Sequence, residues 1–284
     1  MQLSVVIPAY NEEAVIGNVL DQITALDVAS EVLVVDDGSS DRTAEVAQAH
    51  AGVRVISHPY NMGNGAAVKT GIRHATGDHI LLMDGDGQHP PAVIPELLAH
   101  TDRYEMVVGA RTSASDSHPA RDVANQVFNV YASYITGQQV KDLTSGFRVV
   151  RTDIARSFLY LLPNGFSYPS TLTITLFRAG YAVKYVPFAA PARVGKSKVR
   201  PFKDGLRFLM TVTRLGTLFV PLKIFVPISV LCLVSGGLYT LGKLIFESRF
   251  SGFGGLVFTV GLLIFLLGLI SEQIALLRYI NSDR

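Results

Sequence analysis

The chain has very little cysteine, since Cys232 is the only one among its 284 residues. A single cysteine excludes an intrachain disulfide, and it also excludes a metal site built from cysteine thiolates. The first residues lack the basic stretch that opens a secretory signal peptide and lead directly into a strand-like segment. We therefore expect the soluble part of the chain to stay in the cytoplasm.

Long repeats, low-complexity tracts and a strong charge of one sign are also missing. The net charge of +2 identifies no partner by itself, and no nucleic acid is expected to bind. The hydrophobic fraction of 49% is high for a soluble enzyme, and the excess is concentrated after Leu218. The composition therefore predicts membrane-spanning segments in the last part of the chain.

Two familiar nucleotide motifs and one metal motif are absent. Gly63-Asn64-Gly65 with Lys69-Thr70 lies close to a phosphate loop, but Val68 precedes the lysine where that motif needs glycine. Val68 also takes the place of the last glycine in G-x-G-x-x-G. We interpret this stretch as a glycine-rich helix start near a nucleotide. The seven histidines form no H-x-x-x-H pair, and His89 alone lies beside an acidic motif.

The first hundred residues alternate short β-branched runs with helical patterns, joined by short turns. Asp41 is placed to cap the second of these helices. The alternation predicts a mostly parallel sheet with helices on both faces, in which ligands bind at the carboxyl ends of the strands. The expected strands are residues 3–7, 31–35, 53–57 and 79–83, and the expected helices are residues 11–26, 42–51 and 65–75.

Acidic residues follow three of these strands. One apolar run ends in Asp84 and Asp86, with only Gly85 between them. Two carboxylates this close repel each other, and a hard divalent cation such as Mg²⁺ or Mn²⁺ resolves the conflict through oxygen ligands. An isolated D-x-D can also be a solvated turn. Because Tyr10-Asn11-Glu12 and Asp36-Asp37 end two other strands, we favour a site for a nucleotide diphosphate with a metal.

Four motifs follow one another in a fixed order: PAYNEE at 8–13, VDDGS at 35–39, NMGNG at 61–65 and DGDGQHP at 84–90. The series resembles that of glycosyltransferase family 2, of the dolichyl-phosphate mannose synthase and undecaprenyl-phosphate glycosyltransferase type. The resemblance covers nearly the whole chain through Lys198. It implies a GT-A fold, which is a Rossmann-like α/β domain with a mostly parallel sheet that binds a nucleoside diphosphate sugar.

The same resemblance implies roles for individual residues. Asp37 would lie near the base, Asp84 and Asp86 would contact metal and diphosphate, and Gln88 would contact the sugar or the metal. For Pro8 and Asp36, strand termination and turn geometry are alternative explanations. The expected nucleotide-sugar-binding residues are Pro8, Tyr10, Glu12, Asp37, Asp84 and Gln88, and the expected metal ligands are Asp84, Asp86 and Gln88.

The middle of the chain continues the sheet. Residues 106–110 are expected to form a fifth strand that ends at Arg111, a cation placed to face a diphosphate. The polar residues 112–119 are a candidate lid. A helix is expected at residues 123–135 and another up to residue 179, followed by a strand at 183–187. The first of these helices carries one apolar face, formed by Val123, Val127, Val130, Tyr131 and Tyr134.

The segment Asp142 to Arg148 reads DLTSGFR, and it resembles a D-x-x-S-G-F-R segment that lines the acceptor side of the sugar site in the same family. The second pKa of a phosphate monoester is about 6, so such an acceptor is already largely anionic at neutral pH. Positioning and charge neutralisation can then do most of the work. Asp142 is either a base or a positioning residue. The expected catalytic residues are Asp142, Asp86, Arg111 and Arg148.

Eight basic residues lie between Arg193 and Lys223, interleaved with apolar ones, and Asp204 is the only acid among them. The pattern predicts an amphipathic helix on a membrane surface. The start of this stretch, R-x-G-x-S-K, resembles a family motif that grips the phosphates of donor and lipid acceptor. It has one residue fewer before Ser-Lys than eukaryotic and archaeal mannose synthases have. The expected lipid-phosphate ligands are Arg193, Ser197 and Lys198.

Residues 224–246 and 254–277 are two apolar segments, each long enough to span about 30 Å of hydrocarbon. Their short connection predicts a transmembrane hairpin, for which a buried soluble hairpin is the alternative. Basic residues before and after it place both ends in the cytoplasm, with the protein in the inner membrane. The expected organisation is a catalytic domain at 1–192, a membrane-interface segment at 193–223, the hairpin and a tail at 278–284. Self-association through the glycine-rich spans is a further hypothesis.

Together these features predict a membrane-anchored, inverting glycosyltransferase that uses Mg²⁺ or Mn²⁺. It would move one sugar from a UDP- or GDP-sugar to a polyprenyl phosphate at the cytoplasmic face. One alternative is a family 2 enzyme with another glycan or glycolipid acceptor, although the hairpin is too small for the channel of a processive polymerase. Another is a non-catalytic nucleotide-binding scaffold, which the intact Asp84, Asp86 and Gln88 argue against.

Overall fold

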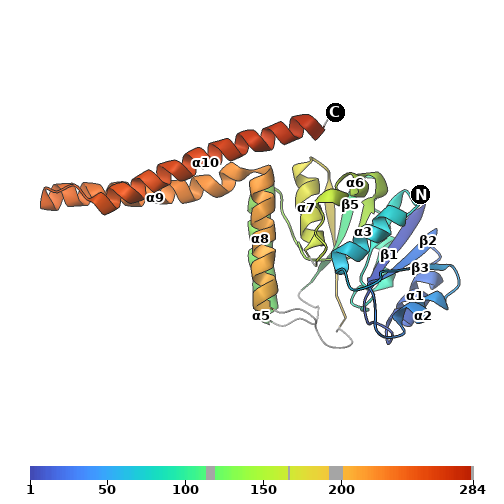
Figure 1. Cartoon of the computed structure of the whole chain (residues 1–284). Helices are drawn as coiled ribbons and strands as arrows, with labels where there is room; N and C mark the ends of the chain where they lie inside the picture. The colour runs from blue at the N-terminus through green and yellow to red at the C-terminus, as the bar shows by residue number, and fades with distance from the viewer. Residues whose placement is uncertain (113–118, 166, 192–200, 283–284) are drawn as a thin grey trace. The chain divides into compact units, whose positions relative to one another are not determined.

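The computed structural model describes residues 1–112, 119–165, 167–191 and 201–282. The chain divides into two compact units, Met1–Phe208 and Leu209–Arg284. The first unit contains a sheet with helices packed on it, and the second contains two long helices (Figure 1). The predicted α/β domain and helical hairpin are both present.

The sheet of the first unit has seven strands in the order β3-β2-β1-β4-β6-β5-β7. β6 runs antiparallel to β4 and β5, and the other neighbours are parallel. Six strands were predicted within two residues at their ends. β6 was not predicted from the sequence. The strands are β1 Leu3–Ala9, β2 Glu31–Asp36, β3 Val53–Ser57, β4 His79–Leu82, β5 Met106–Arg111, β6 Arg148–Arg151 and β7 Val183–Phe188.

β1 continues past the proline that was expected to end it, so that prediction is wrong. Pro8 pairs with Val35 of β2, while the pairing of β1 with β4 stops at Val6. A proline lacks the N–H that a central strand needs for its ladder, but Pro8 lies where β1 has only one neighbour. The added residues carry the strand to Ala9, directly before the first polar loop.

Helices cover both faces of the sheet. The predicted start of the first helix at Asn11 is wrong, because α1 begins at Ile16. The intervening N–H groups donate instead to side chains that follow β2, with Asn11 donating to Ser39 and Glu12 donating to Thr43. The helices are α1 Ile16–Ala25, α2 Thr43–Gln48, α3 Asn64–His74, α4 Ile94–Leu98, α5 Pro119–Thr136, α6 Thr152–Ser157 and α7 Tyr168–Arg178, with 3-10 turns at Pro91–Val93 and Leu159–Leu161.

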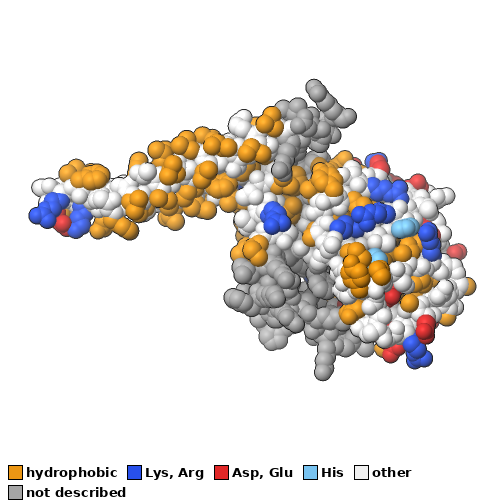
Figure 2. Space-filling model, in the orientation of Figure 1, with side chains coloured by type: hydrophobic (Ala, Val, Ile, Leu, Met, Phe, Trp, Pro, Cys, Tyr) orange, Lys and Arg blue, Asp and Glu red, His pale blue; other side chains and the backbone are white. Residues whose placement is uncertain are grey.

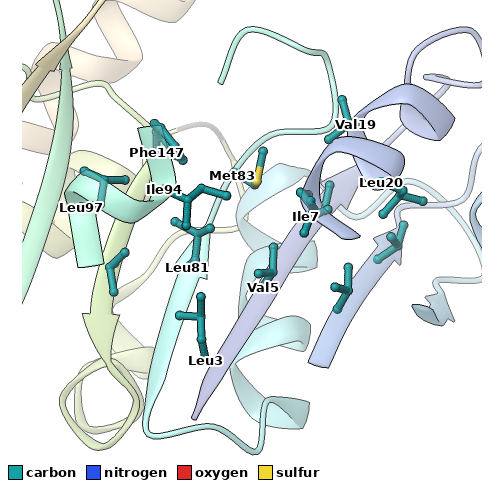
Figure 3. Packing of buried hydrophobic residues seen from close by; sticks show 14 of the residues in the cluster. Leu3, Val5, Ile7, Val19, Leu20, Leu81, Met83, Ile94, Leu97 and Phe147 are labelled. Carbon is teal, nitrogen blue, oxygen red and sulfur yellow. The ribbon is translucent and has the colours of Figure 1, made fainter. Parts of the chain in front are cut away.

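The central strand β1 separates two packed layers. Leu3, Val5 and Ile7 point to one face, where Figure 3 shows them beside side chains of β4, α1 and α4. Val6 points to the other face, where a Cβ added to Gly71 of α3 would lie 2.2 Å from its Cγ1. Burying a side chain of this size contributes about 1.5–3 kcal/mol, so both layers hold β1 firmly and the loops at its carboxyl end start from a rigid base.

α5 carries the predicted apolar face, but much of that face does not join the core. Val127, Val130 and Tyr134 are 58%, 71% and 49% exposed, whereas Ala132 and Ile135 are buried. Helical spacing alone therefore identified an amphipathic helix without showing which side packs inward. Residues 113–118, which make up most of the predicted lid, lie outside the described residues.

The second unit holds the hairpin of α9 (Pro221–Glu247) and α10 (Gly252–Ser282), while α8 (Pro201–Phe219) crosses the boundary between the units. The apolar windows of the two long helices have mean hydropathies of 2.0 and 2.6 but are only 11% and 17% buried. Figure 2 shows hydrophobic side chains over much of this surface. A core hairpin of a soluble protein would be mostly buried, so we identify α9 and α10 as membrane-spanning helices.

Glycines at seven-residue intervals on α10 pack against α9. A Cβ added to Gly254 would lie 2.2 Å from Oγ1 of Thr240, and one added to Gly261 would lie 2.9 Å from the backbone N of Leu233. Gly268 makes a similar close approach to α9 one further interval along. These small residues let the two spans pack closely within one chain. Self-association through the hairpin stays a prediction.

Candidate active site

The loops that follow β1 and β2 are joined at the carboxyl edge of the sheet. Ser40 donates its N–H to Oδ1 of Asn11 at 2.8 Å, and Asn11 has a positive φ of 54° that turns its loop toward this contact. Tyr10 and Glu12 lie in the same loop and are half-buried, while Pro8 is buried in β1. Three of the predicted nucleotide-binding residues therefore lie on one rigid strand end and the loop that follows it.

Asp37, at the end of β2, is fully engaged with the protein. Its Oδ1 accepts the N–H of Met62 at 2.9 Å and lies 2.8 Å from Nδ1 of His58, and its Oδ2 accepts the N–H of Gly63 at 2.8 Å. His58 contacts Oγ1 of Thr70 through its other ring nitrogen at 2.9 Å. Because Asp37 is only 2% exposed, a contact with a nucleobase would require the residues that cover it to move.

Asp84 and Asp86 lie in the loop that follows β4. The Asp84 side chain is 32% exposed, and its Oδ1 accepts a hydrogen bond from Nδ2 of Asn64 at 3.3 Å. Asp86 accepts the backbone N–H of Gln88 at 3.1 Å, and Gly87 takes a positive φ of 76° in the turn between them. A glycine suits this left-handed conformation because it has no Cβ. The turn therefore brings both acids and Gln88 into one short loop.

His89 lies buried beneath this loop. The N–H of Asp84 donates to its Nδ1 at 2.9 Å, which leaves the proton on Nε2, 4.0 Å from Oδ2 of Asp84. Burial lowers the pKa of His89 against the opposing charges of Asp84 and Asp86, so the ring is neutral at physiological pH. The ring also stacks on Phe147 with centroids 5.1 Å apart. His89 thus holds the backbone of the acidic loop on the core.

Arg111 and Asp142 form a buried ion pair. Nε and Nη2 of Arg111 donate to the two carboxylate oxygens at 2.8 and 2.9 Å, and the Arg111 backbone N–H donates at 3.1 Å. Burial raises the pKa of Asp142, but the hydrogen bonds and charge of Arg111 outweigh it and leave that pKa below its ordinary value. A general base works best with a pKa near the working pH, so this geometry favours positioning over proton abstraction.

Arg148, a predicted catalytic residue, is fully buried in β6. Its Nη1 donates to the carbonyl of Pro169 at 2.8 Å and to Oγ1 of Thr173 at 3.0 Å, and its Nη2 donates to the carbonyl of Ser145. A side chain with no exposed surface does not touch substrate in this conformation. The burial therefore favours Arg148 as a positioning residue that ties the 145–148 segment to α7.

Gly146 brings that segment against the acidic loop. A Cβ added to Gly146 would lie 3.0 Å from Oδ2 of Asp84, 3.0 Å from the hydroxyl of Tyr168 and 3.4 Å from His89. The predicted acceptor-side motif at residues 142–148 therefore lies beside Asp84 of the predicted metal motif. Asn64, Gly146 and Tyr168 were absent from the predicted site residues, although Asn64 and Gly146 lie inside motifs that were recognised.

The glycine-rich start of α3 lies beside Asp84 through Asn64, and the N–H groups of Ala66 and Ala67 are occupied. The N–H of Ala66 donates to the carbonyls of Gly63 and Asn164 at 2.8 and 3.1 Å. A Cβ added to Gly65 would lie 2.1 Å from the carbonyl oxygen of Pro163. The helix start is thus covered by the chain itself, which argues against a phosphate bound on these N–H groups.

The described residues contain no group of three or more His, Cys, Asp or Glu side chains placed to hold a metal ion. Mg²⁺ commonly binds through one or two carboxylates and completes its shell with water and substrate phosphates. Asp84 and Asp86 fit an open site of that kind. Arg193, Ser197 and Lys198, the predicted lipid-phosphate ligands, lie outside the described residues.

Comparison with known sequence families gives two matches. Residues 4–159 match the profile of Glycosyl transferase family 2, which covers all four motifs and the segment from Asp142 to Arg148. Residues 220–277 match the GtrB C-terminal hairpin, which corresponds to α9 and most of α10.

Several curated proteins are similar in sequence. A dolichyl-phosphate hexose transferase of Haloferax volcanii is 32% identical over 206 residues, which cover 72% of this chain and 89% of the relative. An undecaprenyl-phosphate 4-deoxy-4-formamido-L-arabinose transferase of Salmonella dublin is 35% identical over 56% of this chain. A dodecaprenyl-phosphate galacturonate synthase of Rhizobium johnstonii is 31% identical over 55% of it. The chain spans about half the length of these two bacterial relatives, 51% and 49%.

Solved structures establish the fold of the first unit. Glucosyl-3-phosphoglycerate synthase of Mycobacterium tuberculosis, in complex with Mn²⁺, UDP and glucosyl-3-phosphoglycerate, matches with a TM-score of 0.60 at 24% identity. The match covers 76% of this chain and 80% of that protein. The seven-stranded mixed sheet is therefore a GT-A-like fold.

Proposed function

We propose, from the premise that the chain belongs to glycosyltransferase family 2, that it transfers one sugar from a nucleoside diphosphate sugar to a polyprenyl phosphate. The observation that carries the proposal is the joining, in one chain, of the accessible Asp84–Asp86 loop with a membrane-spanning hairpin of the GtrB type. The loop supplies a diphosphate site and the hairpin brings that site to a lipid. The relatives named above act on dolichyl, undecaprenyl or dodecaprenyl phosphate, which are all polyprenyl phosphates.

Asp84 and Asp86 would hold the divalent cation, with Gln88 as a further oxygen ligand. When bound, Mg²⁺ or Mn²⁺ stabilises the negative charge of the leaving diphosphate as a Lewis acid. The protein side of this site is preorganised, because Asn64 and His89 hold the side chain and the backbone of Asp84. Pro8, Tyr10 and Glu12 would border the nucleoside at the end of β1. Asp37 would act there by holding the loop of residues 58–63.

The acceptor needs little proton chemistry, because a phosphate monoester is already anionic at neutral pH. Its oxygen would attack the anomeric carbon as the bond to the diphosphate breaks, and this single in-line displacement inverts the configuration. The Asp142–Arg111 pair borders this region at the end of β5 and would position the reacting groups rather than abstract a proton. Arg193, Ser197 and Lys198 remain the proposed contacts of the lipid phosphate.

The hairpin would anchor the enzyme in the cytoplasmic membrane, with the GT-A unit on the cytoplasmic side. The basic and apolar residues interleaved along the sequence of α8 favour contact of this helix with a membrane surface.

Transfer of radiolabel into lipid tests this proposal. The full chain in detergent would receive labelled UDP- and GDP-sugars, a short-chain polyprenyl phosphate, and either Mn²⁺ or a chelator. We expect one donor to label the organic phase only with metal, and the Asp86→Ala variant to abolish that label. Transfer to another glycolipid would support the alternative acceptor, and nucleotide binding without transfer from any donor would support a scaffold.

A further inference from the structure

The loop that joins β3 to α3, residues 58–63, exposes two large apolar side chains. Tyr60 is 65% exposed and Met62 is 40% exposed. Isolated apolar residues on a surface are common and need no explanation. These two lie within three residues of each other, at the carboxyl edge of a sheet, where α/β proteins bind their ligands. They are therefore candidates for contact with a ligand.

Asp37 fixes the second half of this loop. It accepts the N–H groups of Met62 and Gly63 at 2.9 and 2.8 Å. His58, at the start of the loop, contacts both Asp37 and Thr70 through its ring. The side chain of Met62 therefore starts from a held backbone. A ligand that binds to a preorganised loop pays little for ordering it.

Gly38 brings the first half of the loop against the end of β2. A Cβ added to Gly38 would lie 2.8 Å from Cα of Tyr60 and 2.6 Å from its carbonyl carbon. The backbone of Tyr60 thus lies directly on the residue that follows Asp37. The N–H of Asp37 donates to the carbonyl of Ala9 at 2.9 Å, and Ala9 precedes Tyr10. Tyr60 is therefore held beside the strand ends at which the nucleoside is proposed to bind.

The same stretch of chain leads to the proposed diphosphate site. Asn64, directly after the loop, donates from its side chain to Asp84 at 3.3 Å. β1 lies between β2 and β4, and neighbouring strands are about 4.8 Å apart, so the ends of β2 and β4 are about 10 Å apart. The base and the diphosphate form opposite ends of a nucleoside diphosphate. With the diphosphate at Asp84 and Asp86, the base can reach the end of β2.

We propose that Tyr60 provides the aromatic face on which the nucleobase of the donor stacks, with Met62 as a second apolar contact. Asp37 holds the loop that presents both side chains. Every base has a face that can stack on an aromatic ring, and a flexible methionine side chain adapts to the shape beside it. This inference rests on the proposed function only in placing the diphosphate at the Asp84–Asp86 loop.

The test measures ligand binding to the full-length protein in detergent by calorimetry. UDP, GDP and inorganic pyrophosphate would each be titrated in the presence of Mn²⁺, because pyrophosphate offers the diphosphate chemistry without a base. We expect Tyr60→Ala to weaken binding of the preferred nucleotide about tenfold, a typical loss for a stacked base, and to leave pyrophosphate binding unchanged. Tyr60→Phe keeps the ring and should bind as the wild type does. Met62→Ala should weaken nucleotide binding about threefold.

Tyr160→Ala is the matched control. Tyr160 is 76% exposed and lies on the 3-10 turn Leu159–Leu161, away from the β3–α3 loop in sequence. Because both tyrosine rings are mostly exposed, both alanine variants should keep the wild-type thermal midpoint. Nucleotide binding should weaken in Tyr60→Ala and stay unchanged in Tyr160→Ala.

Equal affinity of the wild type and Tyr60→Ala for the preferred nucleotide would overturn the inference. An equal loss for nucleotide and pyrophosphate would overturn it too, because the effect would then lie at the diphosphate. The same holds if Tyr60→Phe binds as weakly as Tyr60→Ala, or if the wild type binds UDP and GDP no more tightly than pyrophosphate.

Failure of the proposed function gives a different result. The wild-type protein would then bind a nucleotide with Mn²⁺ but label no polyprenyl phosphate. In that case the difference between Tyr60→Ala and Tyr160→Ala in nucleotide binding still decides the inference.

Discussion

Asp37 and Asp84 lie at the ends of β2 and β4, the two strands that flank β1, yet the protein treats their carboxylates differently. Asp37 is 2% exposed and receives two backbone N–H groups as well as a contact from His58. The Asp84 side chain is 32% exposed, and Asn64 contacts one of its oxygens at 3.3 Å. The sequence presents both as acids that follow an apolar run.

The difference arises from what the neighbouring loop supplies. After β3 the chain turns back across Asp37 with consecutive backbone donors, and these satisfy the charge inside the protein. Beside Asp84, the nearby 145–148 segment presents Gly146, which occupies almost no volume. A buried carboxylate that accepts two backbone N–H groups holds a loop in place, whereas one that is 32% exposed can reach a ligand. The strand-end rule predicts the edge of the sheet at which a ligand binds, and we expect the local exposure of each acid to decide whether it contacts that ligand.

The largest effects are expected from removing the negative charge of Asp84 or of Asp37, one variant at a time. Asp84→Asn should abolish Mn²⁺-promoted nucleotide binding and lower sugar transfer on the order of 100-fold or more, because a bound cation supplies several kcal/mol. Asp37→Asn should lower the free energy of unfolding by about 1–3 kcal/mol, because the new amide opposes a backbone donor. Metal titrations by calorimetry and thermal unfolding by circular dichroism separate the two results.

The contrast between Asp37 and Asp84 would be wrong if Asp37→Asn removed the Mn²⁺ promotion of nucleotide binding at an unchanged thermal midpoint. It would also break if Asp84→Asn unfolded the protein and kept its metal response. A lowered midpoint with intact Mn²⁺ promotion in Asp37→Asn would instead place Asp37 firmly among the residues that hold the fold.

Asp142 belongs with Asp37 by the same criterion, since it is 5% exposed and paired with Arg111. We expect Asp142→Asn to lower the free energy of unfolding by about 2 kcal/mol at neutral pH, because it removes the negative charge that pairs with Arg111. The pKa of Asp142 is depressed in the folded state, so its stabilisation is complete above the unfolded pKa of about 3.9 and is lost as pH falls through the lower folded value.

Unfolding midpoints measured from pH 8 to pH 3 would check this sign. The gap between wild type and Asp142→Asn should stay constant down to about pH 5 and shrink below about pH 4. A gap that grew toward low pH would contradict the ion pair. A pH–rate profile for transfer whose acidic limb disappears in Asp142→Asn would instead identify Asp142 as a general base.

Much of this arrangement could be predicted from the sequence. Apolar runs and turn residues identified six strands, and they placed the acids of the β4 loop at the carboxyl edge of the sheet. These features are local, or they follow from the rule that parallel strands share a carboxyl edge. The hairpin was equally clear, because its two segments are apolar over more than twenty residues.

The contacts that assign roles were not predictable, because they join distant segments. Nothing in the order of residues shows that Met62 and Gly63 satisfy Asp37, or that Arg148 turns inward onto α7. β6 was missed because its pairing with β4 depends on a chain reversal about 70 residues later.

A smaller effect is expected from filling the gap beside Asp84. Gly146→Ala places a methyl group 3.0 Å from both Asp84 Oδ2 and the Tyr168 hydroxyl, so one of them must move. We expect Mn²⁺-promoted nucleotide binding to weaken about tenfold, with a loss of about 1 kcal/mol in stability. Gly165→Ala is the control, because a Cβ there meets nothing within 4 Å. If Gly146→Ala and Gly165→Ala showed equal Mn²⁺-promoted nucleotide binding, the small size of Gly146 would not matter for the site around Asp84.

The smallest effect is expected at Thr70, whose hydroxyl contacts His58, the ring that contacts Asp37. Thr70→Val removes the hydroxyl that contacts His58 at 2.9 Å and keeps the shape of the side chain. The loss of one hydrogen bond should lower the free energy of unfolding by about 1 kcal/mol, while Asp37 keeps its two backbone donors. Nucleotide binding should keep its full dependence on Mn²⁺, because no contact of Asp84 changes. If calorimetry showed a weaker metal response in this variant, the two strand ends would be coupled through α3, which carries both Thr70 and Asn64.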